Sequence, residues 1–347
     1  MTKKTLRVRF VPFTQDISLG TYRIWVHDYC SYMQNIGIDA AIIPVNRLEE
    51  AFKDGDIIIL GKGGDSFYTS ICEFAAKNYP NTIVGTITPP ATLRDTPFDF
   101  VMAGSPEEAD SLAFNQNTII NAHIESLYWD IDPKKHTDKS SLVIGVHGWS
   151  PHLGSFVPNL KWALEEYEKE QKFELRIICE NENFNWTVGR PEIENISFRQ
   201  WDFSTITENI LECDIGLIPG ITDLSHYVSQ FGVQPSHGLF DSDYIFRLKN
   251  KCNNGRSLVF HYLGVPVIAD FSPSHFHLLG GGDCGYLANT KEGWLYGLRK
   301  LKDYKHRNQF STNAYSRVKH EYNPYTWAQK YYDAMETIYN EKRSKKL

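Results

Sequence analysis

A cluster of basic residues just ahead of a predicted helix is the part of the sequence best suited to binding an anion. Lys249, Lys251 and Arg256 flank a polar turn at residues 253–255, and an apolar helical pattern continues from there to residue 263. The first turn of a helix presents unpaired N–H groups and a partial positive charge, which suit a phosphate. The sequence therefore predicts a phosphate-binding segment, although three cations of this kind also occur on ordinary solvated loops.

The elements that must position this segment follow from an alternation of strands and helices. Gly264 ends the helix, and residues 265–269 form a short apolar run typical of a buried parallel strand. The same alternation opens the chain, with an expected strand at 6–11, a helix at 22–35 and a strand at 38–43. Repeated units of this kind predict parallel sheets covered by helices on both faces.

A polar stretch divides this alternation into two halves. Residues 131–141 are rich in Asp, Lys and Ser, and a new run of strands and helices begins at residue 142. We therefore expect an α/β protein with two tandem Rossmann-like domains, each a doubly wound parallel sheet, at residues 1–138 and 139–315.

Composition narrows the class of protein. The chain has 347 residues and a formal net charge of −6, so no global positive field attracts nucleic acid. Its six cysteines are scattered without a CxxC motif, as in a cytoplasmic protein with reduced thiols. We find no signal peptide and no apolar run near the ~20 residues that span a bilayer. The basic stretch at 341–346 leaves open a contact with anionic lipid.

Ligands of open parallel sheets bind beyond the carboxyl ends of the strands. Six loops are expected there, at residues 13–20, 61–65, 147–150, 180–183, 201–203 and 249–257. Four of the six belong to the second half, so we expect the larger, anionic ligand there and a second substrate on the first half, across a cleft. Gly20, Arg23 and Asp65 lie in or beside the first-half loops and are the candidates for that second substrate.

Several short motifs then occur in a fixed order. They are the strand, loop and Arg23-bearing helix of residues 8–37, the strand and loop of 144–149, CDIGLIP at 213–219, Lys251 and Arg256 followed by GVPVIA at 264–269, and GDCGYL at 282–287. In type and order they resemble the motifs of two-domain GT-B-fold glycosyltransferases that use nucleotide sugars, especially the retaining family 4.

The resemblance implies an activity and a set of site residues. It implies transfer of a sugar from a nucleotide-diphosphate sugar to a glycan, glycolipid or other acceptor, without a metal or other cofactor, as in polysaccharide biosynthesis in the cytoplasm or at the inner face of a membrane. Lys251 and Arg256 would hold the donor diphosphate, and residues 316–347 would form a helix that packs back on the first domain. The other implied donor-binding residues are Gly148, Trp149, Glu180, Trp201, Asn254 and Ser257.

One departure from the family pattern keeps two alternatives open. Many members carry a pair of Glu residues before the Gly-Pro strand, whereas this chain has Asn250, Asn253 and Asn254 there and an inserted-looking stretch at 223–244. A GT-B-fold nucleotide-sugar epimerase would need acid/base carboxylates, for which the candidates are Asp65, Asp95 and Glu180. A non-catalytic nucleotide- or sugar-binding module is the other alternative.

Three further motifs are weaker. The glycine-rich run at 280–285 has GxGxxG spacing but does not lie tightly between a strand and a helix, so we do not expect a dinucleotide site. Asp241 and Asp243 have the spacing of a DxD metal motif but follow no long apolar strand. His275 and His277 are expected in a solvated loop and not in a metal site.

Overall fold

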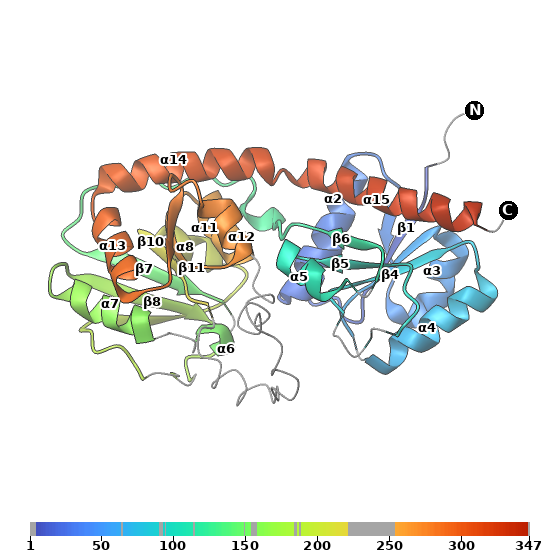
Figure 1. Ribbon diagram of the computed structural model, residues 1–347, viewed down its shortest axis with the longest axis horizontal. Helices are drawn as coiled ribbons and strands as arrows, with labels where there is room; N and C mark the ends of the chain where they lie inside the picture. Colours follow the sequence, from blue (N-terminus) through green and yellow to red (C-terminus); the bar gives the residue numbers. More distant parts are fainter. Residues whose placement is uncertain are drawn as a thin grey trace. The chain divides into compact units, whose positions relative to one another are not determined.

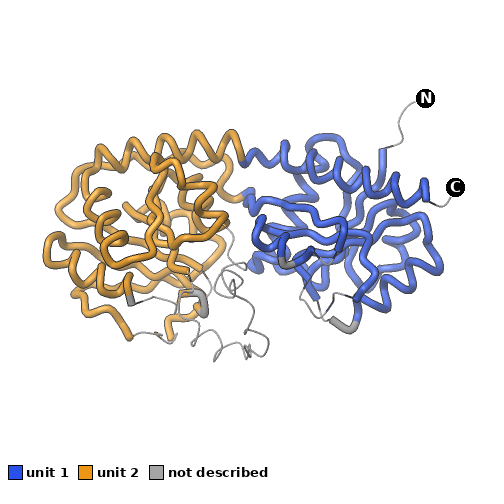
Figure 2. Tube along the Cα trace, in the orientation of Figure 1, with its two compact units in different colours: residues 1–126, 322–347 blue, residues 127–321 orange. Residues whose placement is uncertain are grey.

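The chain divides into two compact units, of which the first combines the two ends of the chain and the second is one continuous segment. The computed structural model describes residues 5–63, 65–89, 93, 95–113, 115–148, 150–153, 158–183, 186, 189–220 and 254–345. Unit 1 combines Met1–Ser126 with Tyr322–Leu347, and unit 2 is Leu127–Glu321 (Figure 2). The C-terminal residues therefore complete the unit in which the chain begins.

Unit 1 is built on a six-stranded sheet in the order β2-β1-β3-β4-β5-β6. Every neighbouring pair is parallel, as expected of strands joined by helical crossovers. The strands are β1 (Val8–Val11), β2 (Ala40–Ile42), β3 (Ile57–Leu60), β4 (Ile83–Ile87), β5 (Phe100–Ala103) and β6 (Thr118–Ile120). The helices are α1 (Gly20–Tyr22), η1 (Arg23–Asp28), α2 (Tyr29–Asn35), η2 (Val45–Arg47), α3 (Leu48–Asp54), α4 (Asp65–Asn78), α5 (Pro106–Ser111) and α15 (Pro324–Ser344).

The two faces of this sheet are covered by different helices (Figure 1). One face packs on α3, α4 and α5 through a buried cluster that includes Phe52, Tyr68 and Leu112. The other face packs on α2 and α15, where the Tyr29 and Tyr331 rings lie 5.7 Å apart and the Tyr331 hydroxyl contacts the sulfur of Met102. The 21-residue helix α15 is thus a structural part of unit 1.

Unit 2 repeats the plan with a second six-stranded parallel sheet, in the order β12-β11-β10-β7-β8-β9. The strands are β7 (Leu142–His147), β8 (Phe173–Cys179), β9 (Ile196–Gln200), β10 (Ile215–Ile218), β11 (Val267–Asp270) and β12 (Gly285–Ala288). The helices are η4 (Ser126–Tyr128, which begins at the last residue of unit 1), α6 (Ser150–Leu153), α7 (Pro158–Glu168), α8 (Ile206–Leu211), α11 (Gly255–Tyr262), α12 (Pro273–Leu279), α13 (Lys291–Leu301) and α14 (Tyr304–Glu321). Two tandem doubly wound parallel sheets confirm the predicted fold class.

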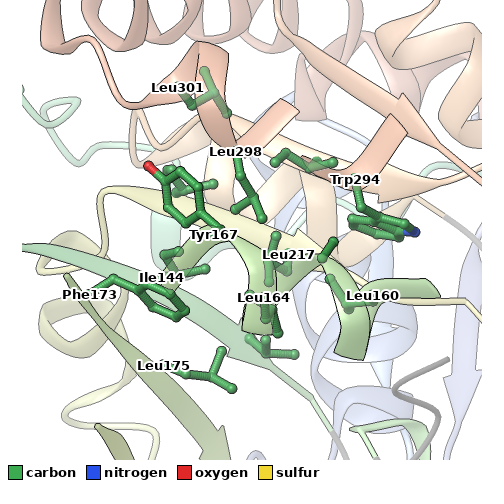
Figure 3. Close-up of a cluster of buried hydrophobic side chains, with 14 of the residues drawn as sticks. Ile144, Leu160, Leu164, Tyr167, Phe173, Leu175, Leu217, Trp294, Leu298 and Leu301 are labelled. Atoms are coloured by element: carbon green, nitrogen blue, oxygen red, sulfur yellow. The ribbon is translucent and has the colours of Figure 1, made fainter. Parts of the chain in front are cut away.

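The core of unit 2 lies between its sheet and helices α7 and α13. Figure 3 shows Ile144 and Leu217 from the sheet facing Leu164 of α7 and Trp294 of α13. On the opposite face α11 approaches closely, because a Cβ on Gly216 would lie 2.6 Å from the ring of Phe260. The glycine of the CDIGLIP motif therefore has a packing role: it allows the helix that begins at Gly255 to lie directly on β10.

Several elements differ from the sequence-based expectation. The single helix expected at 22–35 is divided by the π-helix η1, and residues 316–321, expected to begin the C-terminal helix, instead end α14. His275 lies in α12 and not in a solvated loop: it is 3% exposed and its Nδ1 is 3.0 Å from the Asp270 carbonyl oxygen. His277, on the same helix, is exposed as predicted.

Three global features can be stated for the described residues. Their five cysteines are buried and unbridged, while Cys252 lies outside them. None of their helices combines the length and apolar character needed to cross a bilayer. Within the same ranges, no three His, Cys, Asp or Glu side chains group as metal ligands would.

Candidate functional site

The predicted phosphate-binding segment begins helix α11 at the carboxyl edge of the unit 2 sheet. Asn254 precedes the helix and is 7% exposed. Its backbone carbonyl accepts a hydrogen bond from the Leu258 backbone N–H at 2.9 Å. Arg256 is half-buried in the first turn, where its Nη2 donates to the carbonyl of Pro219, just beyond β10, at 3.3 Å. A guanidinium is thus held beside the first turn of a helix, the arrangement that suits an anion.

Gly148 brings the neighbouring strand against this arginine. It follows β7 with φ +142°, a conformation that is strained for any residue with a Cβ. A Cβ at this position would lie 3.2 Å from Cδ of Arg256. The structure therefore places Arg256 beside Gly148, where a side chain at position 148 would crowd it.

His147, at the end of β7, and Ser257, in the first turn of α11, are buried beside Arg256. Burial, and secondly the charge of Arg256, lower the pKa of His147 to about 4, so its ring is neutral at pH 7. His147 Nε2 is 3.3 Å from the Arg256 carbonyl oxygen. Ser257 is fully buried, and its Oγ has no hydrogen-bond partner among the residues described. The region around the start of α11 thus contains one cation (Arg256), one neutral imidazole (His147) and one hydroxyl (Ser257).

Glu180 has a local role that the sequence does not reveal. Its carboxylate accepts hydrogen bonds from the backbone N–H of Ser150 at 3.1 and 2.9 Å and from the Ser150 hydroxyl at 2.6 Å. It therefore holds the start of α6 to the end of β8. Trp201 follows β9 and donates its backbone N–H to the Cys179 carbonyl at 2.7 Å, so the residues beyond β8 and β9 are neighbours.

Sequence reasoning missed one acid at this edge. Asp270 ends β11 and is 2% exposed. Its Oδ2 lies 2.4 Å from where a Cβ on Gly220 would be, so the glycine after β10 makes room for the carboxylate. The signal was present, because an acidic residue directly follows the apolar run VPVIA at the carboxyl end of a predicted strand.

The first-half candidates lie at the carboxyl edge of the unit 1 sheet. Gly20 begins α1 and Asp65 begins α4. Arg23 is 5% exposed; its Nε and Nη2 donate to Glu125 at 3.0 and 2.8 Å, and its Nη1 donates to two loop carbonyls. Arg23 thus organises the loop after β1 from within. Glu125 was not identified from the sequence.

Other predicted site residues are either outside the described residues or away from the carboxyl edges of the sheets. Lys251, Trp149 and the acids Asp241 and Asp243 lie outside the described residues. Asp95, a candidate acid for an epimerase, lines a cavity of about 560 Å³ with Asp99, Asn117 and Lys342, among residues that precede β5 and β6. It is therefore not at the carboxyl end of a strand.

Comparisons with known proteins identify the fold. The chain matches no protein-family model and no curated protein sequence. Among solved structures, HepE from Anabaena in complex with UDP and glucose is similar with a TM-score of 0.64 at 10% identity, covering 95% of this chain and 99% of that one. A glycosyltransferase from Rickettsia africae has a TM-score of 0.63 at 12% identity, covering 97% of this chain and 99% of that one. Sucrose-phosphate synthase from Thermosynechococcus elongatus has 0.62 at 10%, covering 96% and 100%. The architecture is the two-domain GT-B fold of these neighbours.

Proposed function

We propose that this protein transfers a sugar from a nucleotide-diphosphate sugar to a hydroxyl group of an acceptor. The observation that carries the proposal is the contact of Arg256 with Gly148 at the start of α11, on the carboxyl edge of the unit 2 sheet. HepE, which is similar in fold, was solved with UDP and with UDP-glucose. Unit 2 would bind the donor, and unit 1 the acceptor through its loops after β1 and β3.

The chemistry of transfer explains why a cation is needed at the start of α11. The bond between the anomeric carbon and the diphosphate oxygen breaks, the acceptor oxygen bonds to that carbon, and the proton of the acceptor hydroxyl passes to the departing diphosphate or to water. Negative charge then grows on the departing diphosphate. Arg256 and the first N–H groups of α11 would stabilise that charge, which is commonly the largest contribution in such steps. We assign Lys251 the same role, and Trp149, Glu180, Trp201, Asn254 and Ser257 to the surroundings of the donor.

We further propose a retaining, hexosyltransferase-like enzyme of the family 4 type that acts in the cytoplasm or at the inner membrane face on a glycan or glycolipid. The reaction should need no metal, because arginine and lysine provide the charge that a divalent cation provides elsewhere. Turnover should therefore persist in excess EDTA. Loss of turnover that Mn²⁺ restores would contradict this and direct attention to Asp241 and Asp243.

The epimerase alternative is less well supported. It needs acid/base carboxylates beside the sugar. The Glu180 carboxylate accepts three hydrogen bonds from Ser150, and Asp95 lines a cavity away from the carboxyl strand ends. We therefore retain transfer as the proposed reaction, and a non-catalytic binding module remains an outcome of the experiment below.

The experiment has two steps. Calorimetric titration with UDP, GDP and ADP tests for a nucleotide-diphosphate site, starting with UDP because HepE binds it. Incubation with the matching nucleotide glucose and free sugars then tests for a transferred product by mass spectrometry. Binding followed by transfer supports the proposal. Binding without turnover identifies a non-catalytic module, conversion of the nucleotide sugar to an isomer identifies an epimerase, and absence of binding overturns the proposal.

A further inference from the structure

The π-helix η1 in unit 1 turns two charged side chains toward the same neighbour. It spans Arg23–Asp28, and both end residues are buried, at 5% and 1% exposure. In an α-helix, residues five apart point about 140° away from each other, because each residue turns ~100°. A π-helix closes its hydrogen bonds between residues i and i+5 and so brings such residues close to one line. The π-helix is therefore the geometry that lets Arg23 and Asp28 face one segment.

That segment lies between β6, which ends at Ile120, and η4, which begins at Ser126. Nε and Nη2 of Arg23 donate to Oε2 of Glu125 at 3.0 and 2.8 Å. The carboxylate of Asp28 accepts from the backbone N–H and from the hydroxyl of Ser126, both at 2.9 Å. Two adjacent residues, Glu125 and Ser126, thus hold the two ends of η1.

Only one of these two contacts continues into the loop after β1. Nη1 of Arg23 donates to the carbonyls of Ile17 and Ser18 at 2.9 and 3.0 Å. The loop is further shaped by Asp16, which accepts hydrogen bonds from the backbone and side chain of Ser18 at 2.9 and 2.7 Å. The buried guanidinium therefore connects Glu125 to the loop, whereas the contact of Asp28 with Ser126 ends at the helix.

We propose that Glu125 is a positioning residue for the acceptor: through Arg23 it fixes the conformation of the loop at residues 13–19. This rests on the proposed function, in which unit 1 binds the acceptor. The loop lies at the carboxyl end of β1, which pairs with β2 and β3, and ligands of parallel sheets bind at such ends. A loop already held in its binding conformation loses less conformational entropy when the ligand arrives.

The chain offers a matched pair of variants. Glu125→Gln keeps the size of the side chain but removes the charge that holds Arg23. Ser126→Ala removes one hydrogen bond from the neighbouring contact with Asp28 and leaves Arg23 and the loop untouched. Hydrogen exchange of the full-length protein measures the loop without any need for turnover. We expect exchange at residues 13–19 to be at least tenfold faster in Glu125→Gln and unchanged within twofold in Ser126→Ala.

Kinetics adds a readout that a general loss of packing would not produce. With UDP-glucose as donor and glucose as acceptor probe, Glu125→Gln should raise the acceptor KM at least fivefold. The dissociation constant for UDP and kcat at saturating acceptor should stay within twofold of wild type. Arg23→Lys should not retain the wild-type acceptor KM, because an ammonium cannot bridge a carboxylate and two carbonyls as the planar guanidinium does.

The outcomes separate this inference from the proposed function. Unchanged exchange of the loop in Glu125→Gln, or equal acceleration in both variants, overturns the positioning role. If wild type binds no UDP or transfers no glucose, the transferase proposal or the choice of probe fails, and hydrogen exchange alone decides whether Glu125 holds the loop.

Discussion

Arg256 lies where two strand ends of unit 2 meet, with Nη2 on the Pro219 carbonyl and its methylene carbons against Gly148. If it holds the donor diphosphate, Arg256→Ala should weaken UDP binding by about 1.5–3 kcal/mol, the range for hydrogen bonds to charged groups. The loss in kcat/KM should be larger, because charge on the diphosphate grows in the transition state. Calorimetry measures the first effect and initial rates the second.

The control for that variant is Arg190→Ala, which removes an exposed arginine of the same unit. It should change affinity and stability by less than about 0.5 kcal/mol. Arg256→Lys should recover only part of the binding, because it lacks the planar fork of donors. UDP affinities that are equal in wild type and Arg256→Ala would remove the main support for a transferase.

Gly148 allows a second test at the residue scale. Gly148→Ala forces a Cβ into a φ of +142° and against Arg256, so we expect lower stability, by about 1–3 kcal/mol, together with weaker UDP binding. Gly189→Ala is the control: its φ is +81°, but among the described residues its Cβ would meet only the end of Lys161, at 3.9 Å. Urea denaturation and calorimetry should show that both variants lose stability while only the first loses affinity. Equal affinity losses would mean that strain, and not the contact with Arg256, matters.

At the scale of elements, the connecting segment is fastened to β10. Lys134 and Lys139 each lie within 3.1 Å of the fully buried Asp214, whose Oδ2 also accepts the Val143 backbone N–H at 3.0 Å. Burial alone would raise the pKa of Asp214, but the His136 ring, whose Nδ1 lies 3.8 Å from Oδ1, and the charge of Lys134 hold it well below its usual range. A segment with linker-like composition is thus an integral part of unit 2.

Removal of this buried anion should release the segment. Asp214→Asn leaves Lys134 buried without its counter-charge, so we expect a loss of about 3–5 kcal/mol in unfolding free energy and faster hydrogen exchange at residues 131–141. Glu194→Gln, which breaks an exposed ion pair with Lys172, should cost less than about 1 kcal/mol. If the two variants unfold at the same urea concentration, the ion pairs of Asp214 contribute little to the stability of unit 2.

At the scale of the whole molecule, each unit has its own core and should unfold as its own cooperative step. Tyr331→Ala, on α15, should lower only the transition of unit 1, and Trp294→Ala, in the core cluster of Figure 3, only that of unit 2. UDP at one hundred times its dissociation constant should raise the unit 2 transition alone, by about 2.7 kcal/mol of stability. Scanning calorimetry tests all three. A single transition that both variants and UDP shift together would contradict this division.

The sequence determined most of the architecture because the relevant signals are local. Apolar runs of four to six residues, separated by amphipathic helices, identified the parallel strands of both sheets apart from β12, and the start of α11. The basic segment at the start of α11 could also be predicted, since a helix terminus and its basic residues are neighbours along the chain, whereas the packing of Gly216 against Phe260 could not. The predicted helix at 22–35 nevertheless contains a π-helix, whose end residues Arg23 and Asp28 contact Glu125 and Ser126, about 100 positions later.

Only the tertiary structure decided the roles of side chains whose partners are distant. Arg23 reads as a ligand residue beside a loop, but its carboxylate partner is 102 positions later. Glu180 was predicted to contact the nucleotide-sugar donor, and the structure shows that its carboxylate also accepts hydrogen bonds from Ser150, 30 positions earlier. Residues 131–141 read as a linker until Lys139 meets Asp214, 75 positions away. Burial of a charge demands a partner, and no periodicity in the chain states which distant residue the folded sheet will bring to it.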